Sequence, residues 1–179
     1  MNPDHLFTLL RQASKVVLIV VIFTLLFPLL LGFVLSVPSS VVLGLVSSTF
    51  ILQANAVFVG VAMGLHPAMI IAVMTIFEVG AVLAIFETCD TFAMESARVR
   101  AMLEKTEKKM QTMKYLSKYG VYTLLFLPAL PIIGLYSSVV IAWITRWDRR
   151  LSLLFITLGW IGMCLFLLFM KFGVLMIFL

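Results

Sequence analysis

Apolar residues fill most of this chain, and charged residues interrupt them in only a few places. No charged residue occurs from position 16 to position 77, and further uncharged runs cover 79–86, 119–145 and 151–170. Coiled into a helix, the first run alone would be about 90 Å long, or roughly three bilayer hydrocarbon cores. We divide the pattern into five apolar segments: Val16–Val37, Val41–Leu65, Ala68–Phe86, Tyr119–Thr145 and Leu151–Met170.

The composition excludes a soluble fold. Of the 179 residues, 63% are hydrophobic and 12% are charged, and the mean hydropathy is +1.18. Soluble domains average about 45–50% apolar and about 25% charged residues, so this chain has too little polar surface to fold alone in water. We therefore expect an all-α integral membrane protein, and not a soluble enzyme, a disordered chain or a secreted disulfide scaffold.

The basic residues constrain the topology because cytoplasmic loops retain Lys and Arg. If all five segments cross the membrane, a basic region faces outward whichever side the N-terminus takes. The regions in question are Arg11 with Lys15, the Arg146–Arg150 cluster, and seven basic residues within 87–118. The same retention explains the net charge of +5, so we expect no nucleic-acid partner.

Two re-entrant hairpins would place every basic region in the cytoplasm. In this topology, segment 41–65 enters the membrane from the outside and returns to the outside. Segment 119–145 enters the membrane from the cytoplasm and returns to the cytoplasm. The alternative is that both segments cross the membrane fully. Polar residues, Pro and Gly break helices and so mark the expected turning points. The expected apex residues are Gln53 and Asn55 in the first hairpin, and Pro128, Pro131 and Gly134 in the second.

The re-entrant topology predicts a single membrane domain with about three spanning helices and two hairpins. Its N-terminus is expected in the cytoplasm, as an uncleaved anchor, and its location is expected to be the cytoplasmic (plasma) membrane. The expected parts of the domain 1–179 are an anchor helix at 16–37, a hairpin plus spanning helix at 41–86, a cytoplasmic amphipathic helix at 87–118, and a second hairpin plus spanning helix at 119–171.

The two hairpin units resemble each other in opposite orientations. Their spanning helices share a faint pattern, Thr75-Ile-Phe-Glu-Val-Gly80 against Thr157-Leu-Gly-Trp-Ile-Gly162. Opposed units of this kind form the inverted-topology repeat of many secondary transporters.

Glu78 is the most informative residue because it lies near the middle of an apolar segment. A carboxylate inside a bilayer is costly and faces protein or water. We interpret Glu78 as a proton-accepting or cation-coordinating group beside the hairpin tips. The alternative is a protonated side chain that only holds a neighbouring hairpin.

Other polar residues are candidates for a substrate path or for lipid contact. The path candidates beside Glu78 are Gln53, Asn55, Tyr136 and Ser137. Gln53 and Asn55 would equally serve to satisfy the broken backbone of the hairpin. At the cytoplasmic surface, Arg146, Arg149 and Arg150 form either a stop-transfer cluster or a site for anionic lipid headgroups.

The segment 90–118 has the spacing of an amphipathic helix, with apolar residues recurring every three or four positions. It is either a solvated connector or a surface that holds the membrane or another chain. We expect membrane lipids as partners, together with a homodimer or a partner membrane subunit bound through this segment.

Catalytic and metal-binding templates are absent from the sequence. It has no Ser-His-Asp set, no H-E-x-x-H and no phosphate-binding glycine loop. His5 and His66 are isolated, and Cys89 and Cys164 give no sign of a disulfide. We therefore expect no metal, no cofactor and no enzyme activity.

Three stretches resemble the small multidrug export family. Gly60-Val-Ala-Met-Gly-Leu-His-Pro67 resembles its G-I-A-x-G-L-x-P stretch, and Leu130-Pro-Ile-Ile-Gly-Leu-Tyr-Ser137 resembles its P-G-T-G-A-W-T core. Val140-Ile-Ala-Trp-Ile-Thr-Arg-Trp-Asp-Arg-Arg150 resembles its A-W-L-L-G-L-D-R-K stretch. The family is similar in plan to the DedA/VTT (SNARE-associated Golgi protein) superfamily, which implies paired re-entrant hairpins and, for some members, movement of polyprenyl-phosphate or phospholipid headgroups.

The chain departs from the family pattern at charged positions. The stretch Leu52–Phe58 lacks the Glu and Arg of the family's E-L-R-G-A-I-P, whereas Glu78 stands where the family has Asn. The expected function is a small secondary transporter or a lipid or polyprenyl-phosphate translocase, proton-coupled through Glu78. The alternative, favoured by the missing charges, is a non-transporting scaffold or accessory subunit of a larger complex.

Overall fold

The structure is a computed structural model that describes residues 3–95, 99, 101, 103, 104, 106, 120–127 and 134–178. All of the secondary structure in these residues is helical, so the prediction of an all-α fold is confirmed. Within the described ranges, four segments are long and apolar enough to cross a membrane: Leu10–Val34, Ser39–Ala62, Pro67–Thr91 and Arg149–Lys171.

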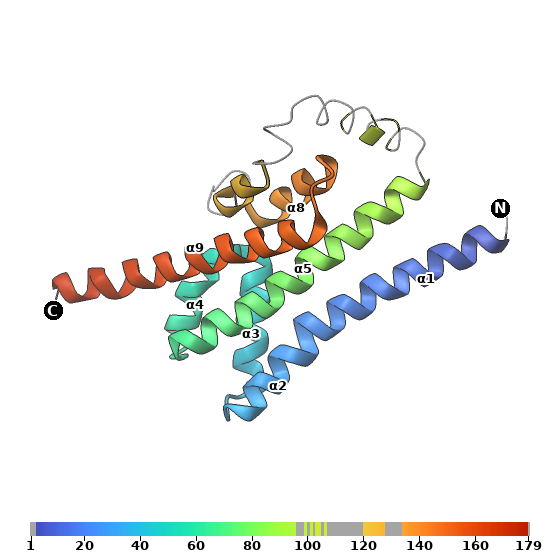
Figure 1. Cartoon of the computed structure of the whole chain (residues 1–179). Helices are drawn as coiled ribbons and strands as arrows, with labels where there is room; N and C mark the ends of the chain where they lie inside the picture. Colours follow the sequence, from blue (N-terminus) through green and yellow to red (C-terminus); the bar gives the residue numbers. More distant parts are fainter. Residues whose placement is uncertain are drawn as a thin grey trace.

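The chain begins with one long rod made of α1 (Pro3–Val20), the π-helical turn η1 (Val21–Leu26) and α2 (Phe27–Val34), which are continuous in Figure 1. The π turn comes just before Pro28, whose ring nitrogen has no N–H to continue the α-helical ladder. The rod starts well before the anchor expected at 16–37, because Arg11, Gln12, Ala13 and Lys15, just ahead of the apolar run, are good helix formers that let the helix extend toward the N-terminus.

The segment after the rod folds back on itself. It consists of α3 (Ser39–Leu52), the short turn η2 (Gln53–Asn55) and α4 (Ala56–Ala62), and α3 and α4 contact each other side by side (Figure 1). Gln53 has a φ of +52°, which is rare for a residue with a side chain and ends α3 abruptly. At 1.5 Å per residue, α3 is about 21 Å long and α4 about 10 Å, and a bilayer core is about 30 Å thick.

Two long helices and a second broken segment complete the described fold. α5 (Pro67–Glu95) and α9 (Arg149–Phe178) run in opposite directions against each other (Figure 1). Between them in sequence, η3 (Gly120–Leu125) packs on α9, and α8 (Gly134–Ile144) packs on α5 and α9. The expected apex residues Pro128 and Pro131 and most of the expected helix 87–118 lie outside the described residues.

The turn between α4 and α5 matches the turn between α8 and α9. In the first, the Leu65 N–H donates to the Gly60 carbonyl at 3.1 Å, and in the second the Trp147 N–H donates to the Ala142 carbonyl at 3.3 Å. The residue before each donor has positive φ, +75° at Gly64 and +57° at Arg146. This is the Schellman form of a helix end. The α2–α3 turn shares it, so the turn alone is a local motif.

Equivalent residues of the two matching turns are 82 positions apart in the sequence. The same 82-residue shift also relates residues of the helices that follow these turns. The same shift relates Thr75 of α5 to Thr157 of α9, and Gly80 to Gly162. The faint sequence pattern therefore lies in register with the observed turns.

α5 forms the centre of the packed core. Its buried side chains contact residues from α3, α4, α8 and α9, whereas the rod leaves large apolar side chains uncovered, with Phe33 84% exposed. Large apolar side chains that stay exposed on the protein are unfavourable in water but stable against lipid, so this surface fits a membrane environment.

Gly159 of α9 provides a test of this packing. A Cβ at this position would collide with the backbone carbonyl oxygen of Leu125 in η3, whereas a Cβ at Gly162, one turn further, would meet no atom within 4 Å. We expect Gly159→Ala to lower the free energy of unfolding by about 1–3 kcal/mol. The matched change Gly162→Ala should be neutral or stabilising by up to about 1 kcal/mol, because Ala favours a helix. Unfolding in mixed micelles measures both, and equal effects would contradict the close approach of η3.

Candidate functional site

Glu78 lies near the middle of α5 and is completely buried. The Thr157 hydroxyl of α9 donates to its carboxyl group, at 3.0 Å from Oε2 and 3.3 Å from Oε1. Among the described residues, no basic side chain forms an ion pair with Glu78. The contact therefore ties the two long helices together by a hydroxyl and a carboxyl group at the point where they cross.

The ends of the two broken segments meet each other. The Leu135 N–H at the start of α8 donates to Gln53 Oε1 at 3.3 Å, and the Tyr136 hydroxyl donates to the Phe50 carbonyl near the end of α3 at 3.0 Å. Gly134 has a φ of +60°, and a Cβ there would lie 2.7 Å from Gln53 Oε1. Glycine adopts this backbone conformation at no steric cost, and its lack of a Cβ leaves room for the amide.

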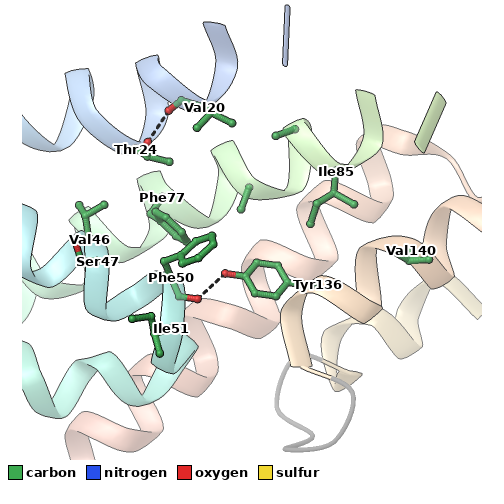
Figure 2. Close-up of a pocket in the computed structure, with 12 residues that line it drawn as sticks. Val20, Thr24, Val46, Ser47, Phe50, Ile51, Phe77, Ile85, Tyr136 and Val140 are labelled. Carbon is green, nitrogen blue, oxygen red and sulfur yellow. Dashed lines mark hydrogen bonds between the residues drawn. The ribbon is translucent and has the colours of Figure 1, made fainter. Parts of the chain in front are cut away.

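A cavity of about 710 Å³ lies beside this contact (Figure 2). It is bounded by the rod, α3, α5 and α8, and Figure 2 shows Phe50, Phe77 and Tyr136 gathered at its centre. The ring of Phe50 stands 6.4 Å from that of Phe77, edge to face, and 6.5 Å from that of Tyr136. The full lining is Val20, Thr24, Val46, Ser47, Phe50, Ile51, Phe77, Ala81, Ala84, Ile85, Tyr136 and Val140.

The lining is almost wholly apolar and contains no charged residue. Two of its three hydroxyl groups already use their hydrogen, because Thr24 donates to the Val20 carbonyl at 2.7 Å and Tyr136 donates to Phe50. Ser47 carries the third hydroxyl. The cavity thus offers aromatic faces and hydrogen-bond acceptors, with little to attract an anion.

The structure separates the predicted path residues into two groups. Gln53 and Tyr136 lie together at the tip contact, and Tyr136 also lines the cavity. Asn55 and Ser137 are exposed and do not line it. Glu78 does not line it either, although Phe77 and Ala81 on the same helix do. Glu78 therefore lies on the side of α5 that faces α9.

The three arginines also differ from one another. Arg149 forms an ion pair with Glu87 of α5 at 2.8 Å and a longer one with Asp90 at 3.6 Å, and the Trp143 indole N–H donates to Asp90 at 2.7 Å. Arg146 and Arg150 are exposed. Arg149 thus joins α9 to the end of α5, and it differs in this from the exposed Arg146 and Arg150.

Sequence analysis missed the partners of several of these residues. Thr157 was visible only as part of the repeat pattern, and nothing marked it as the donor to Glu78. Phe50 and Phe77 are aromatic residues within apolar runs, and no local signal distinguishes them from core residues. Among the described residues, no group of three His, Cys, Asp or Glu side chains could hold a metal ion.

Thr157 provides a direct test of the buried contact. Thr157→Val removes the hydroxyl but keeps the volume, which leaves a buried carboxyl group without its donor. We expect a loss of about 1–2 kcal/mol in the free energy of unfolding. Thr157→Ser keeps the donor and should retain most of the stability. If both variants unfold alike in mixed micelles, the hydrogen bond contributes nothing.

Comparison with protein-family models matches residues 53–166 to a family with the description "Putative small multi-drug export protein". Searches of the curated proteins and of the solved structures each return no match. The matched range covers well over half of the chain and includes Gln53, Glu78, Tyr136 and Thr157. The resemblance seen in the three sequence stretches is thereby confirmed: the chain belongs to the small multi-drug export protein family.

Proposed function

We propose that this protein is a secondary transporter that takes apolar or amphiphilic molecules from the membrane into the cavity beside the tip contact. The observation that carries the proposal is the 710 Å³ cavity, since ligand pockets of about 300–1,000 Å³ with apolar and aromatic walls accept drug-sized molecules. The family description, an export protein, agrees with a transporter in general.

The topology we propose has re-entrant hairpins and an inverted repeat, as in the DedA/VTT plan. Three observations support it. α3 folds back onto α4, and the ends of both pieces lie toward the same end of the molecule (Figure 1). The 82-residue shift relates the two helix-turn-helix units, and α5 and α9 run in opposite directions. In this topology the N-terminus is cytoplasmic and the membrane is the plasma membrane.

We assign coupling to Glu78. Among the ionisable residues of α5, Glu78 lies furthest from either end of the helix. Ionisable side chains deep inside a membrane-spanning helix often mark ion and proton pathways. The carboxyl group lies behind the cavity wall formed by Phe77 and Ala81. A change in its protonation would act on the cavity through the crossing of α5 with α9.

A second candidate substrate is a lipid with an anionic headgroup, such as a polyprenyl phosphate. The exposed Arg146 and Arg150 favour it, because they are free of the ion pairs that hold Arg149. The uncharged lining of the cavity favours the apolar substrate. The scaffold alternative, and a homodimer or partner subunit bound through 90–118, remain proposals that the family match does not address.

Filling the cavity tests the proposed function. Ala81→Trp should block the cavity, whereas Leu158→Trp adds the same ring to an exposed position on α9. In proteoliposomes that contain the full chain, we expect Ala81→Trp to lower transport of tetraphenylphosphonium and of N-phenylnaphthylamine about tenfold, which corresponds to about 1.4 kcal/mol. Leu158→Trp should transport like the wild type. If the wild type moves neither probe but moves a polyprenyl phosphate, the second candidate replaces the first.

A further inference from the structure

The Thr157 hydroxyl is a single donor for the Glu78 carboxyl group. An ionised carboxylate accepts up to about four hydrogen bonds, and a buried charge without enough donors is costly. If Glu78 releases and takes up a proton, its charged form needs more donors than Thr157 provides.

The two helices that meet at Glu78 and Thr157, α5 and α9, each carry one such group. In the described part of the chain, Thr75 Oγ1 and Trp160 Nε1 are buried atoms that have no hydrogen-bond partner. A buried polar group in this state is uncommon and calls for an explanation. Trp160 is only 1% exposed and belongs to the hydrophobic core, and Glu78 is buried as well.

Helical spacing places these four residues at neighbouring positions along the contact between α5 and α9. Thr75 precedes Glu78 by three residues on α5, and Trp160 follows Thr157 by three residues on α9, so each lies one turn along the same face. The helices α5 and α9 are antiparallel (Figure 1). Thr75, one turn before Glu78 on α5, is therefore at the level of Trp160, one turn after Thr157 on α9. The 82-residue shift relates the same residues in another way, since it pairs Thr75 with Thr157 and Glu78 with Trp160.

We propose that Trp160 and Thr75 complete a proton site around Glu78, in which the indole N–H and the Thr75 hydroxyl become donors to the carboxylate once its proton has passed to water. This inference rests on the proposed coupling through Glu78. Only the O–H bond of the carboxyl group breaks, and Trp160 and Thr75 act as positioning residues.

The chemistry of the site selects a proton over a metal cation. The crossing supplies one carboxylate and two hydroxyl oxygens, and a bare cation would have to replace its hydration shell with oxygen ligands. An indole N–H is a donor with no lone pair to offer, so Trp160 would oppose a metal cation in the proposed site.

Other titratable groups on the elements packed against α5 define the controls. These groups are Cys164 within α9 and Tyr136 in the first turn of α8, whereas η1, α2, α3 and α4 carry none. The other charged or titratable residues of α1 and α9 are Asp4, His5, Arg11, Lys15, Arg149, Arg150 and Lys171.

The indole N–H signals of the full chain, recorded by NMR in lipid nanodiscs across a pH series, test the inference. Three tryptophans give three signals, and Trp160→Phe assigns the signal of Trp160. Trp147 serves as the internal reference, because among the described residues its buried indole N–H has no carboxylate partner, whereas that of Trp143 donates to Asp90. We expect the Trp160 signal to move with pH in the wild type and in Cys164→Ser and Tyr136→Phe, but not in Glu78→Gln. Glu78→Met replaces Glu78→Gln if the latter does not fold. Thr75→Val should abolish pH-gradient-driven transport, and Thr75→Ser should restore it.

The infrared carboxyl band of Glu78, assigned by its loss in Glu78→Gln, separates the two ways in which the account can fail. If the band disappears on raising the pH while the Trp160 signal stays fixed, Glu78 exchanges protons without Trp160 and the inference is overturned. If the band is unchanged over the whole pH range, Glu78 does not exchange protons. The inference and the proposed coupling then fail together.

Discussion

The need to satisfy backbone polar groups away from water governs this structure. A chain that breaks its helices inside a bilayer leaves N–H and C=O groups that lipid cannot satisfy. Here the two broken segments supply each other: Gln53 accepts from the Leu135 N–H, and Tyr136 donates to the Phe50 carbonyl. These contacts join segments more than eighty residues apart, and the glycine at 134 leaves room for the amide. The tip contact therefore depends on both halves of the chain.

The positions of the cavity and of Glu78 follow from that contact. Because α3 ends at the tip, the space between its end, α5 and the rod is not filled by a continuous helix, and the cavity occupies it. The opposite side of α5 is held to α9 by the Glu78–Thr157 hydrogen bond and, at the end of the helix, by the Arg149 ion pairs with Glu87 and Asp90. α5 thus has the cavity on one side and a polar crossing on the other. In the proposed transporter, this helix carries the effect of protonation to the substrate.

Much of this arrangement could be predicted from the sequence, because it depends on rare residues in an apolar background. The helical class follows from the long apolar runs, and the break at Gln53 and the interest of Glu78 each follow from a polar group where apolar residues dominate. The partners could not be predicted in the same way. Thr157 is one of many hydroxyl residues in apolar helices, and which of them reaches Glu78 depends on the crossing of α5 with α9. Phe50 and Phe77 look like any core residue until the fold places them around a cavity. Arg149 resembled its neighbours Arg146 and Arg150, and only the packing of α9 on α5 brings it to Glu87.

The central claim is that the segment 39–62 returns to the side of the membrane from which it entered. Labelling of single cysteines with a membrane-impermeant maleimide in intact cells tests it most directly, with Cys89 and Cys164 replaced by Ser. Ser40 and His66 are exposed residues at the two ends of this segment. The account predicts that Ser40→Cys and His66→Cys are both labelled from outside, and that Arg146→Cys is labelled only after permeabilisation. Labelling of Ser40→Cys and His66→Cys from opposite sides would show a full crossing and contradict the account.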